Sequence, residues 1–436
     1  MPAELRVRVA RIGRTGRGLL AIAAAVLVVA PALTAQEAAL ACDPDDGAIT
    51  LPEGFCALVV ADGLGRIRHF AIQPDGDIYL AIRGRSGQTG GVLALRDTTG
   101  DGRADVQLRI TEDSGGTGLL LAGDTLLYGR DDAILRFRLD PVGLGAIGAP
   151  DTLVAGLPSG GGHAAKSLAF APGGDLFVNI GSGSNACQEE NRARESPGRD
   201  PCPELRVRAG IWRFSRVRSC QKPDDGRRWA SGLRNTVALA IRPDDGGLYG
   251  VVHGRDQLHD LWPDRYSERQ SAEKPSEQFV HIVQGGRYSW PECYHDPEAH
   301  RLVLAPEYGG DGEISGPCAT RNQPIAAYPA HWAPNALLFY DGRMFPSRYR
   351  GGAFIAFHGS WNRSPLPQGG YNVVFQPFDE EGPHGDWEIF ADGFAGDDRS
   401  PRGARHRPSG LAIGPDGSLF VADDAGGRVW RILYRP

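Results

Sequence analysis

Residues 157–184 read LPSGGGHAAKSLAFAPGGDLFVNIGSGS, and this stretch decides how the chain folds. Apolar residues alternate at 168–170 and dominate 176–180, on either side of a Pro-Gly-Gly turn. Such runs around such a turn predict a β-hairpin. Three glycines precede His163, so we expect this histidine at the mouth of the first strand.

The same hairpin pattern recurs along the chain. Clear copies begin at Arg68, Lys166, Val237 and Ser409, and weaker copies begin at Gly118 and Asn335. Recurrence at this scale indicates a repeat architecture. A single hairpin leaves a face uncovered, whereas a closed ring of sheets covers every face. The six copies therefore predict an all-β fold, a six-bladed β-propeller of four-stranded antiparallel sheets.

The composition agrees with one large β domain. The chain has 436 residues with 60 glycines and 32 prolines, and 41% of its residues are hydrophobic. Many turns and an ample core are typical of an ordered all-β protein. The net charge of −6 gives no basic footprint for nucleic acid. We expect residues 42–436 to form a single propeller domain.

A lone strand is expected before the first repeat, within residues 51–64 (LPEGFCALVVADGL). The chain ends on another apolar stretch, VWRILYR, at residues 429–435. We predict that these two segments pair in one sheet and so close the ring without a covalent link.

Residues 1–41 are expected to be a signal peptide. Five arginines precede the apolar run Leu19–Ala30, and small residues offer cleavage after Ala32 or Ala41. The run is short for a membrane span, so no stable membrane insertion is expected. Export to the periplasm or the medium is predicted. An uncleaved anchor is the alternative, and a lipoprotein at Cys42 is a poorer match.

Seven cysteines in an exported chain predict disulfide bonds. The pairs that are close in sequence are Cys42 with Cys56, Cys187 with Cys202, and Cys293 with Cys318. Cys220 is then left over, although the sequence leaves other pairings open. No C-x-x-C-H motif for covalent haem is present.

The segment Asp97–Asp105, DTTGDGRAD, resembles half of a calcium-binding loop. Thr99 stands where a carboxylate is expected, and no glutamate follows at the twelfth position. A solvated hairpin tip and a calcium site are both left open for this segment.

Several polar segments occupy equivalent ends of their repeats. They are 162–163, 232–235 with 253–256, 358–363, and 402–408. Together they bring Arg234, Arg363, Arg407 and several histidines towards the ring axis. A mouth rich in guanidinium groups suits a planar polyanion, because an arginine binds a carboxylate through two hydrogen bonds. Alternatively, these arginines cap loops or pair with surface aspartates.

At this point the sequence resembles a known family. The segments GGHAAKSLAFAPGGDLFVNIGS, SGLRNTVALAIRP, GGRYSWPECY, FHGSWNR and RPSGLAIGPDGSLFVADD look like motifs of the glucose/sorbosone dehydrogenase family. These are soluble sugar dehydrogenases that depend on pyrroloquinoline quinone, and the likeness is nearer to their sorbosone dehydrogenase-like branch. It extends from about Leu51 to the C-terminus. The fold implied is again a six-bladed propeller.

The resemblance implies an exported dehydrogenase that oxidises a sugar by hydride transfer to pyrroloquinoline quinone. His163 matches the general base, and a near-neutral imidazole suits that role. The implied cofactor-binding residues are Arg234, Asn235, Arg363 and Arg407. Calcium would be held by the main-chain carbonyls of Gly254 and Arg255. Without a haem segment, electrons must pass to a separate acceptor such as a cytochrome or a quinone.

The chain departs from the glucose-oxidising branch at three places. Gly162 replaces a carboxylate before the base, Gly116 or Thr117 replaces a glutamine, and Arg255 replaces a proline. We therefore expect an aldose, a sorbosone-like aldehyde or a related alcohol rather than glucose itself. Specificity is expected to lie in the insertions at 186–210 and 255–334.

Other interpretations remain. The propeller is alternatively a non-catalytic module that binds carbohydrate or a protein partner, in which case His163 only caps a strand or a turn. A calcium-dependent lactonase fits less well, because the motifs supply arginine and histidine instead of convergent carboxylates. Trp290 and Trp361 are interpreted as residues that pack the blades.

Overall fold

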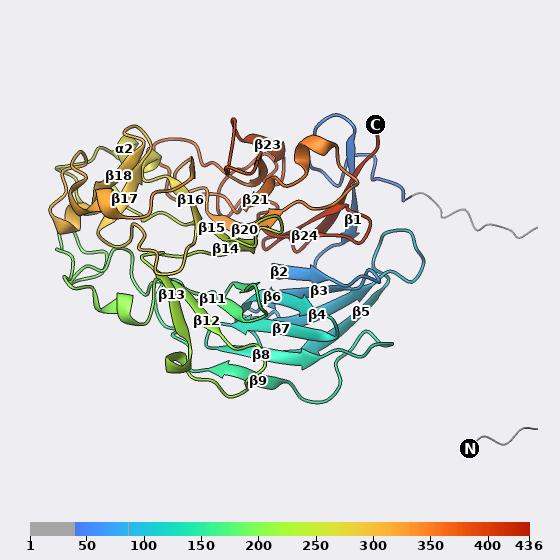
Figure 1. Ribbon diagram of the computed structural model, residues 1–436. Coiled ribbons are helices and arrows are strands. Elements are labelled where there is room, and N and C mark those ends of the chain that lie inside the picture. The colour runs from blue at the N-terminus through green and yellow to red at the C-terminus, as the bar shows by residue number, and fades with distance from the viewer. Residues whose placement is uncertain (1–39, 86) are drawn as a thin grey trace, which may run out of the picture. The chain divides into compact units, whose positions relative to one another are not determined.

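The computed structural model describes residues 40–85 and 87–436, and nearly all of the proposed signal peptide, residues 1–39, lies outside them. Six four-stranded antiparallel sheets follow one another along residues 55–434 (Figure 1). The predicted six-bladed β-propeller is thereby confirmed. No helix among the residues placed by the structure is long and apolar enough to cross a bilayer.

In each blade, the first strand is nearest the ring axis and the fourth is farthest from it. Blade 1 has β2 (Arg66–Ile72), β3 (Ile78–Arg83), β4 (Gly91–Arg96) and β5 (Val106–Thr111). Blade 2 has β6 (Gly116–Ala122), β7 (Thr125–Arg130), β8 (Ala133–Arg138) and β9 (Asp151–Ala155). Blade 3 has β10 (Leu168–Phe170), β11 (Leu176–Ile180), β12 (Gly210–Phe214) and β13 (Arg227–Ser231).

The second half of the ring repeats this order. Blade 4 has β14 (Ala238–Ile241), β15 (Leu248–Val252), β16 (Glu277–His281) and β19 (Ala326–Tyr328). Blade 5 has β20 (Pro334–Phe339), β21 (Ala353–Phe357), β22 (Asn372–Gln376) and β23 (Glu388–Ala391). Blade 6 has β24 (Pro408–Ile413), β25 (Leu419–Asp423), β26 (Val429–Tyr434) and β1 (Phe55–Ala61). The six predicted hairpins are the first two strands of the six blades.

The N-terminal strand closes the ring. β1 pairs antiparallel with β26, with Phe55 opposite Tyr434 and Cys56 opposite Leu433. Figure 1 shows the blue β1 beside the red strands of the chain end. The predicted pairing of the two terminal segments is confirmed.

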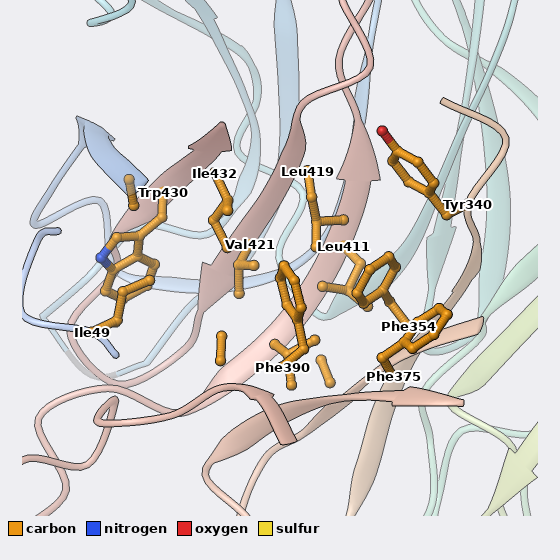
Figure 2. Close-up of a cluster of buried hydrophobic side chains, with 14 of the residues drawn as sticks. Ile49, Tyr340, Phe354, Phe375, Phe390, Leu411, Leu419, Val421, Trp430 and Ile432 are labelled. Carbon is orange, nitrogen blue, oxygen red and sulfur yellow. The ribbon is translucent and has the colours of Figure 1, made fainter. Parts of the chain in front are cut away.

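Aromatic and aliphatic side chains fill the spaces between neighbouring blades. Figure 2 shows the layer where Phe354, Phe375 and Phe390 of blade 5 face the apolar side chains of blade 6. Trp430 of β26 is fully buried there, and its ring lies edge-on to Phe394 with centroids 5.1 Å apart. Burying an aromatic side chain of this size stabilises the fold by several kcal/mol, roughly 3 or more.

The first strands of all six blades surround a cavity of about 430 Å³ on the ring axis. Most of its lining is apolar, and each blade contributes to it through Phe70, Leu120, Phe170, Ile241, Leu338 and Ile413.

Two insertions enlarge blade 4. One carries the helices α1 (Leu258–Leu261) and α2 (Glu268–Glu273), and the other carries the hairpin of β17 (Cys293–Asp296) and β18 (Arg301–Leu304). The five 3-10 turns are η1 (Pro203–Arg206), η2 (Pro223–Asp225), η3 (Pro306–Tyr308), η4 (Gly316–Thr320) and η5 (Ser347–Tyr349).

The three predicted disulfides are confirmed. They join Cys42 to Cys56, Cys187 to Cys202, and Cys293 to Cys318, while Cys220 is free and exposed. The second and third lie in loops inserted between strands, so they restrict segments that the sheets themselves do not hold.

In the loop Asp97–Asp105, the loop's own donors occupy the Asp97 carboxylate. The Asp97 Oδ1 accepts hydrogen bonds from the amides of Thr99 and Gly100, and Oδ2 accepts one from Gly102 at 2.7 Å. This pattern is that of a self-satisfied turn and favours the solvated hairpin tip over the calcium site.

The topology gathers the polar segments at one end of the ring, which we call the rim. In an antiparallel blade, the loop after the second strand and the connection into the next blade's first strand leave at the same edge. Residues 162–163, 232–235 and 402–408 precede first strands, whereas 253–256 and 358–363 follow second strands. All five segments therefore meet at the rim.

Removing residues 427–436 is expected to unfold the whole domain instead of shortening it. The deletion takes away β26, so β1 loses its only pairing partner in blade 6 and the ring opens. Thermal unfolding followed by circular dichroism should show no cooperative transition. A variant lacking only Arg435 and Pro436, which lie beyond the strand, should melt like the full chain; a cooperative transition in the longer deletion would contradict ring closure as the source of stability.

Candidate functional site

His163 stands on the connection that leads into β10, the first strand of blade 3. Its Nδ1 lies 3.0 Å from the carbonyl oxygen of Ser182 and 2.9 Å from the Ser182 hydroxyl. That hydroxyl donates its own proton to the Ser184 carbonyl at 2.7 Å. Both neighbours of Nδ1 therefore act as acceptors. The proton of the neutral ring is on Nδ1, and Nε2 keeps a free lone pair.

The ring of His163 is held in its neutral form. Burial, followed by the nearby Arg234 guanidinium, lowers the pKa of His163 well below its usual 6.5. The imidazole is therefore neutral at neutral pH, with Nε2 unprotonated.

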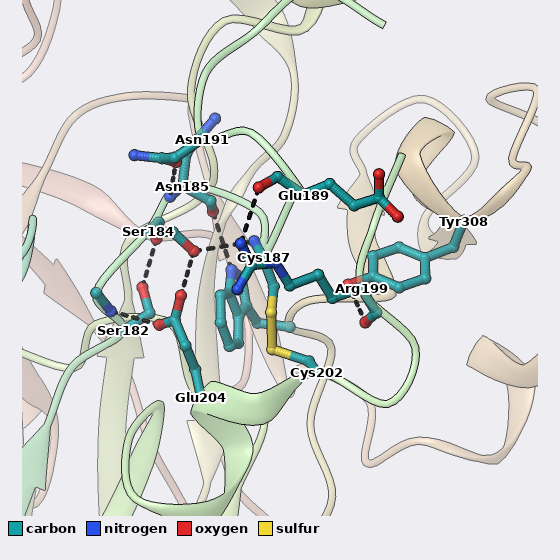
Figure 3. The surroundings of a disulfide bond; sticks show 12 residues. Ser182, Ser184, Asn185, Cys187, Glu189, Asn191, Arg199, Cys202, Glu204 and Tyr308 are labelled. Atoms are coloured by element: carbon teal, nitrogen blue, oxygen red, sulfur yellow. Dashed lines mark hydrogen bonds between the residues drawn. A yellow bond between two sulfur atoms is a disulfide. The ribbon is translucent and has the colours of Figure 1, made fainter. Parts of the chain in front are cut away.

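The loop that carries Ser182 is itself braced. Figure 3 shows Ser184 and Glu204 in contact beside the Cys187–Cys202 disulfide. The Glu204 carboxylate also accepts the Gly183 amide at 2.5 Å. These bonds fix the acceptors that orient His163.

Asn235 lies against the same backbone as His163. A Cβ added at Gly181 would stand 2.6 Å from the His163 Cβ and 3.0 Å from the Asn235 Oδ1, so both side chains border this glycine. The Asn235 Oδ1 is buried and has no hydrogen-bond partner in the described structure. A buried orphan acceptor costs free energy unless a ligand or an ion satisfies it.

Lys166 bonds to the backbone of the segment that carries His163. Its side chain is fully buried and its Nζ donates to the carbonyl of Ala164 at 2.5 Å. Burial lowers the pKa of Lys166 to about 8.

Arg234 is only 3% exposed and is already saturated with partners. Its guanidinium donates to the Asn185 carbonyl at 3.0 Å, to the Asn185 side chain at 2.9 Å and to the Gly254 carbonyl at 2.7 Å. It also pairs with Asp256 at 3.1 Å. Little of its donor capacity is left for a ligand.

Asp256 is the charged centre of this side of the rim. Its carboxylate accepts from Arg192 at 2.8 Å, from Arg234, and from the Asn362 amide at 3.1 Å. Burial raises the pKa of Asp256, but the charge of Arg234 and the other cationic neighbours outweighs this and the net pKa is lowered. The carboxylate therefore stays ionised. Asp256 lies in one of the segments predicted to line the rim, but the sequence predicted no role for it.

Gly254 and Arg255 were expected to offer carbonyl oxygens to calcium. The Gly254 carbonyl instead accepts from the Arg234 guanidinium, and the Arg255 side chain forms a buried ion pair with Glu307. No cluster of three acidic, histidine or cysteine side chains suited to a metal occurs among residues 40–85 and 87–436.

Arg363 and Arg407 differ from Arg234 because each donates only to carbonyl oxygens. Arg363 binds the Ala330 carbonyl at 2.8 Å, and Arg407 binds the His358 and Gly359 carbonyls at 3.0 and 2.7 Å. Neither forms an ion pair within the part of the chain that the structure places. Burial lowers the pKa of both groups. The rim therefore holds two half-buried cations without counter-ions.

Two further histidines are buried on other blades, and one of them, His69, lines the axial cavity. His69 donates through Nε2 to the Asn335 carbonyl and His253 to the Pro334 carbonyl, both at 2.7 Å. Burial lowers the pKa of each to about 4. The sequence pattern missed His69, because it lies inside a strand that looked purely structural.

The opposite side of the rim has its own carboxylate, which sequence reasoning also missed. Asp424 accepts from His358 Nε2 at 2.5 Å and pairs with Arg68. Glu277 is a third buried carboxyl, accepting the amides of Gly254 and Ala333 at 2.7 and 3.0 Å. Burial raises the pKa of Glu277 to about 7.

The two tryptophans have different environments. Trp290 is 5% exposed and donates to the Asn185 carbonyl at 2.9 Å, as a packing residue should. Trp361 is 53% exposed, so its interpretation as a blade-packing residue was wrong.

Comparison with known proteins identifies relatives over nearly the whole described chain. A family model described as TrAA12-like matches residues 49–435. The holo form of the pyranose dehydrogenase PQQ domain from Coprinopsis cinerea has a TM-score of 0.71 and 20% identity, covering 88% of this chain and 97% of that one. The calcium structure of Carbohydrate-Active Enzymes Family AA12 from Trichoderma reesei has a TM-score of 0.71 and 18% identity, covering 92% and 99%.

Two further similarities are more distant or shorter. The PQQ-bound aldose sugar dehydrogenase from Streptomyces coelicolor has a TM-score of 0.53 and 18% identity, covering 88% of this chain and 99% of that one. An uncharacterized protein of Borreliella burgdorferi is 30% identical over 208 residues, 47% of this chain and 48% of that protein. This match spans about half of that relative. At such identities the solved structures show a shared fold.

The buried histidines are expected to make stability fall in acid. His69 has a pKa of about 4 when folded and about 6.5 when unfolded, so its contribution is complete above pH 6.5 and is lost as the pH falls towards 4. The loss is about 1.4 kcal/mol per pH unit for one proton. His69→Gln, which keeps a donor for Asn335, should lower the slope of the unfolding free energy against pH by about one proton. Urea unfolding across this range measures it.

The matched control is His300→Gln, because His300 is exposed and should leave the slope unchanged. An unaltered slope in His69→Gln would show that His69 is not held neutral.

Proposed function

The chain belongs to the TrAA12-like family, and from this membership and the geometry of the rim we propose that it is an exported dehydrogenase that oxidises a sugar with pyrroloquinoline quinone as cofactor. The observation that carries the proposal is the meeting of a neutral, oriented imidazole with two cations that lack counter-ions on one rim. A general base and an anion-binding pair are what such a reaction requires.

The residues on the rim fit the cofactor. Arg363 and Arg407 retain guanidinium donors, and a guanidinium binds a carboxylate through two parallel hydrogen bonds. The orphan side chain of Asn235 offers a further polar contact beside the base. Arg234, whose donors are mostly used, would act on the cofactor mainly through its charge.

The reaction divides between the cofactor and His163. When bound, pyrroloquinoline quinone supplies the acceptor for the hydride that leaves the sugar carbon. His163 takes the hydroxyl proton on Nε2, the nitrogen that the Ser182 contacts leave unprotonated. As the ring becomes positive, its Nδ1–H bond to the Ser182 carbonyl strengthens, and the ionised Asp256 favours the charged ring.

Calcium fits this rim less well. The Gly254 carbonyl already accepts from a guanidinium, and a divalent cation at that oxygen would lie beside the positive charge of Arg234. We therefore keep the calcium site at Gly254 and Arg255 as an expectation only and assign no step to it.

The proposed location is the periplasm or the medium, after removal of the segment 1–41. Three disulfides support an oxidising compartment. Since no covalent haem motif is present in the sequence, electrons would leave the enzyme for a separate acceptor, a cytochrome or a quinone.

His163→Ala should abolish sugar oxidation and still bind the cofactor. Loss of a general base lowers turnover by about 10² to 10⁴-fold, whereas the cations that hold the cofactor remain. The test is to add pyrroloquinoline quinone and calcium to the purified apoprotein, follow its absorbance, and then measure reduction of a dye by a panel of aldoses.

His384→Ala is the matched control, because the His384 side chain has no hydrogen bond in the described structure and lies on a loop at the other end of blade 5. Full activity in His163→Ala would remove the proposed base. Failure of the wild type to bind the cofactor at all would favour a non-catalytic binding propeller.

Arg407→Gln should weaken cofactor binding by about ten- to a hundredfold, because a hydrogen bond between charged groups contributes roughly 1.5–3 kcal/mol. Equilibrium dialysis of the cofactor against both proteins measures the change. Arg138→Gln, which alters an exposed arginine on β8, should bind like the wild type. Equal affinity in Arg407→Gln would exclude this residue from the anion site.

A further inference from the structure

A second, polar cavity of about 230 Å³ lies next to the rim. It opens between the helices α1 and α2 of the blade 4 insertion and the loop that follows β21. Its lining includes Gln257, Asp260, Glu268, Ser271, Trp361 and Asn362. Neither the family motifs nor the rim geometry assigns this cavity a role.

Trp361 gives the cavity an apolar wall. More than half of this side chain, 53%, is open to solvent, although burying an indole is strongly favourable. Trp430, Trp290 and Trp212 are all nearly or completely buried. An indole left open beside a polar hollow is a surface on which an amphipathic ring can stack.

The polar residues that line the rest of the cavity determine which kind of ligand ring it can bind. Asp260 and Glu268 are exposed carboxylates, and Gln257 is steadied by bonds to Arg192 and to Asp260, the latter at 3.3 Å. The cavity is lined by two carboxylates, by no lysine or arginine, and by one histidine, His259, whose Nδ1 is bonded to the Tyr266 carbonyl, so its lining does not favour an anion. Several acceptors around one aromatic face suit a neutral ring with many hydroxyl groups.

The cavity is connected to the rim through Asn362 and through Arg192, which bonds both Gln257 and Asp256. Asn362 lines it and donates through Nδ2 to Asp256, which pairs with Arg234 near His163. The Asn362 Oδ1 is buried and has no partner in the described structure. The cavity is thus linked to Asp256, the carboxylate that pairs with Arg234.

The volume limits the occupant. Pockets for drug-sized ligands begin at roughly 300 Å³, and this cavity is smaller at about 230 Å³. A single sugar ring matches that space.

We propose that this cavity is a subsite for the sugar ring next to the one that is oxidised, with Trp361 as its stacking platform and Asp260 and Glu268 as acceptors for its hydroxyl groups. The inference rests on the proposed function, and it gives the substrate class as disaccharides or longer saccharides. Specificity then lies in the insertion of blade 4, as the sequence predicted for residues 255–334.

The test compares glucose with cellobiose and maltose in the reconstituted holoenzyme. We expect the wild type to have a higher kcat/KM for at least one disaccharide. Trp361→Ala should lower that value about tenfold, through KM, and leave the value for glucose within about twofold. Trp361→Phe keeps an aromatic face and should recover most of the loss.

Side-chain variants that keep size test the polar wall. Asp260→Asn and Glu268→Gln should each raise the KM for the disaccharide several-fold without changing kcat. Ile389→Ala is the control, because Ile389 is an exposed apolar residue on β23, outside the cavity. An equal loss for glucose and the disaccharides in Trp361→Ala, or no loss for either, would overturn the subsite.

The proposed function and the subsite fail in different ways. If the wild type oxidises no sugar, calorimetry of the cofactor-free protein with cellobiose still tests the cavity. Cellobiose binding that is lost in Trp361→Ala would support the subsite. Absence of such binding would overturn the subsite. Binding of choline that salt suppresses would also overturn it, because the indole and the carboxylates would then hold a cation instead of a sugar. If sugar oxidation does not depend on Trp361, the proposed enzymatic function stands and the subsite is excluded.

Discussion

The antiparallel pairing of β1 with β26 is the contact on which the rest of the molecule depends. A blade exposes the edges and faces of its sheet unless neighbours cover them, and only a closed ring gives every blade two neighbours. The aromatic layer between blades 5 and 6, with Trp430 at its end, is complete only when this strand is in place. Ring closure in turn brings the polar loops of separate blades to a common rim.

Neutral histidines and ionised aspartates occur together around the rim. Burial keeps the imidazoles of His69, His163 and His253 neutral, whereas Asp256 and Asp424 stay ionised because cations surround them. Arg363 and Arg407 are partly buried arginines of the rim that donate only to carbonyl oxygens. Their charge favours an anion at the rim.

The sequence predicted the repeated local elements and, from the ring that they imply, the pairing of the chain ends. The Pro-Gly turns, the alternating strands and the near cysteine pairs each depend on a few neighbouring residues, so the blades and disulfides could be predicted. Asp424 and Glu277 could not be predicted. Asp424 pairs with Arg68 of another blade, and Glu277 accepts amides from residues 23 and 56 positions away, which no spacing in the chain records. Trp361 was misassigned because exposure depends on the insertion beside it.

That insertion has a small core of its own. Leu258, Tyr266, Tyr294 and Val303 form a separate apolar cluster, and a disulfide at Cys293 restrains the hairpin. The apolar cluster belongs to the insertion alone, but hydrogen bonds tie the insertion to its neighbours, as where the Gly198 amide donates to the Glu307 carbonyl at 2.8 Å. A change of sequence in this insertion would therefore reshape the surface beside the rim while the strands of the six sheets stay the same.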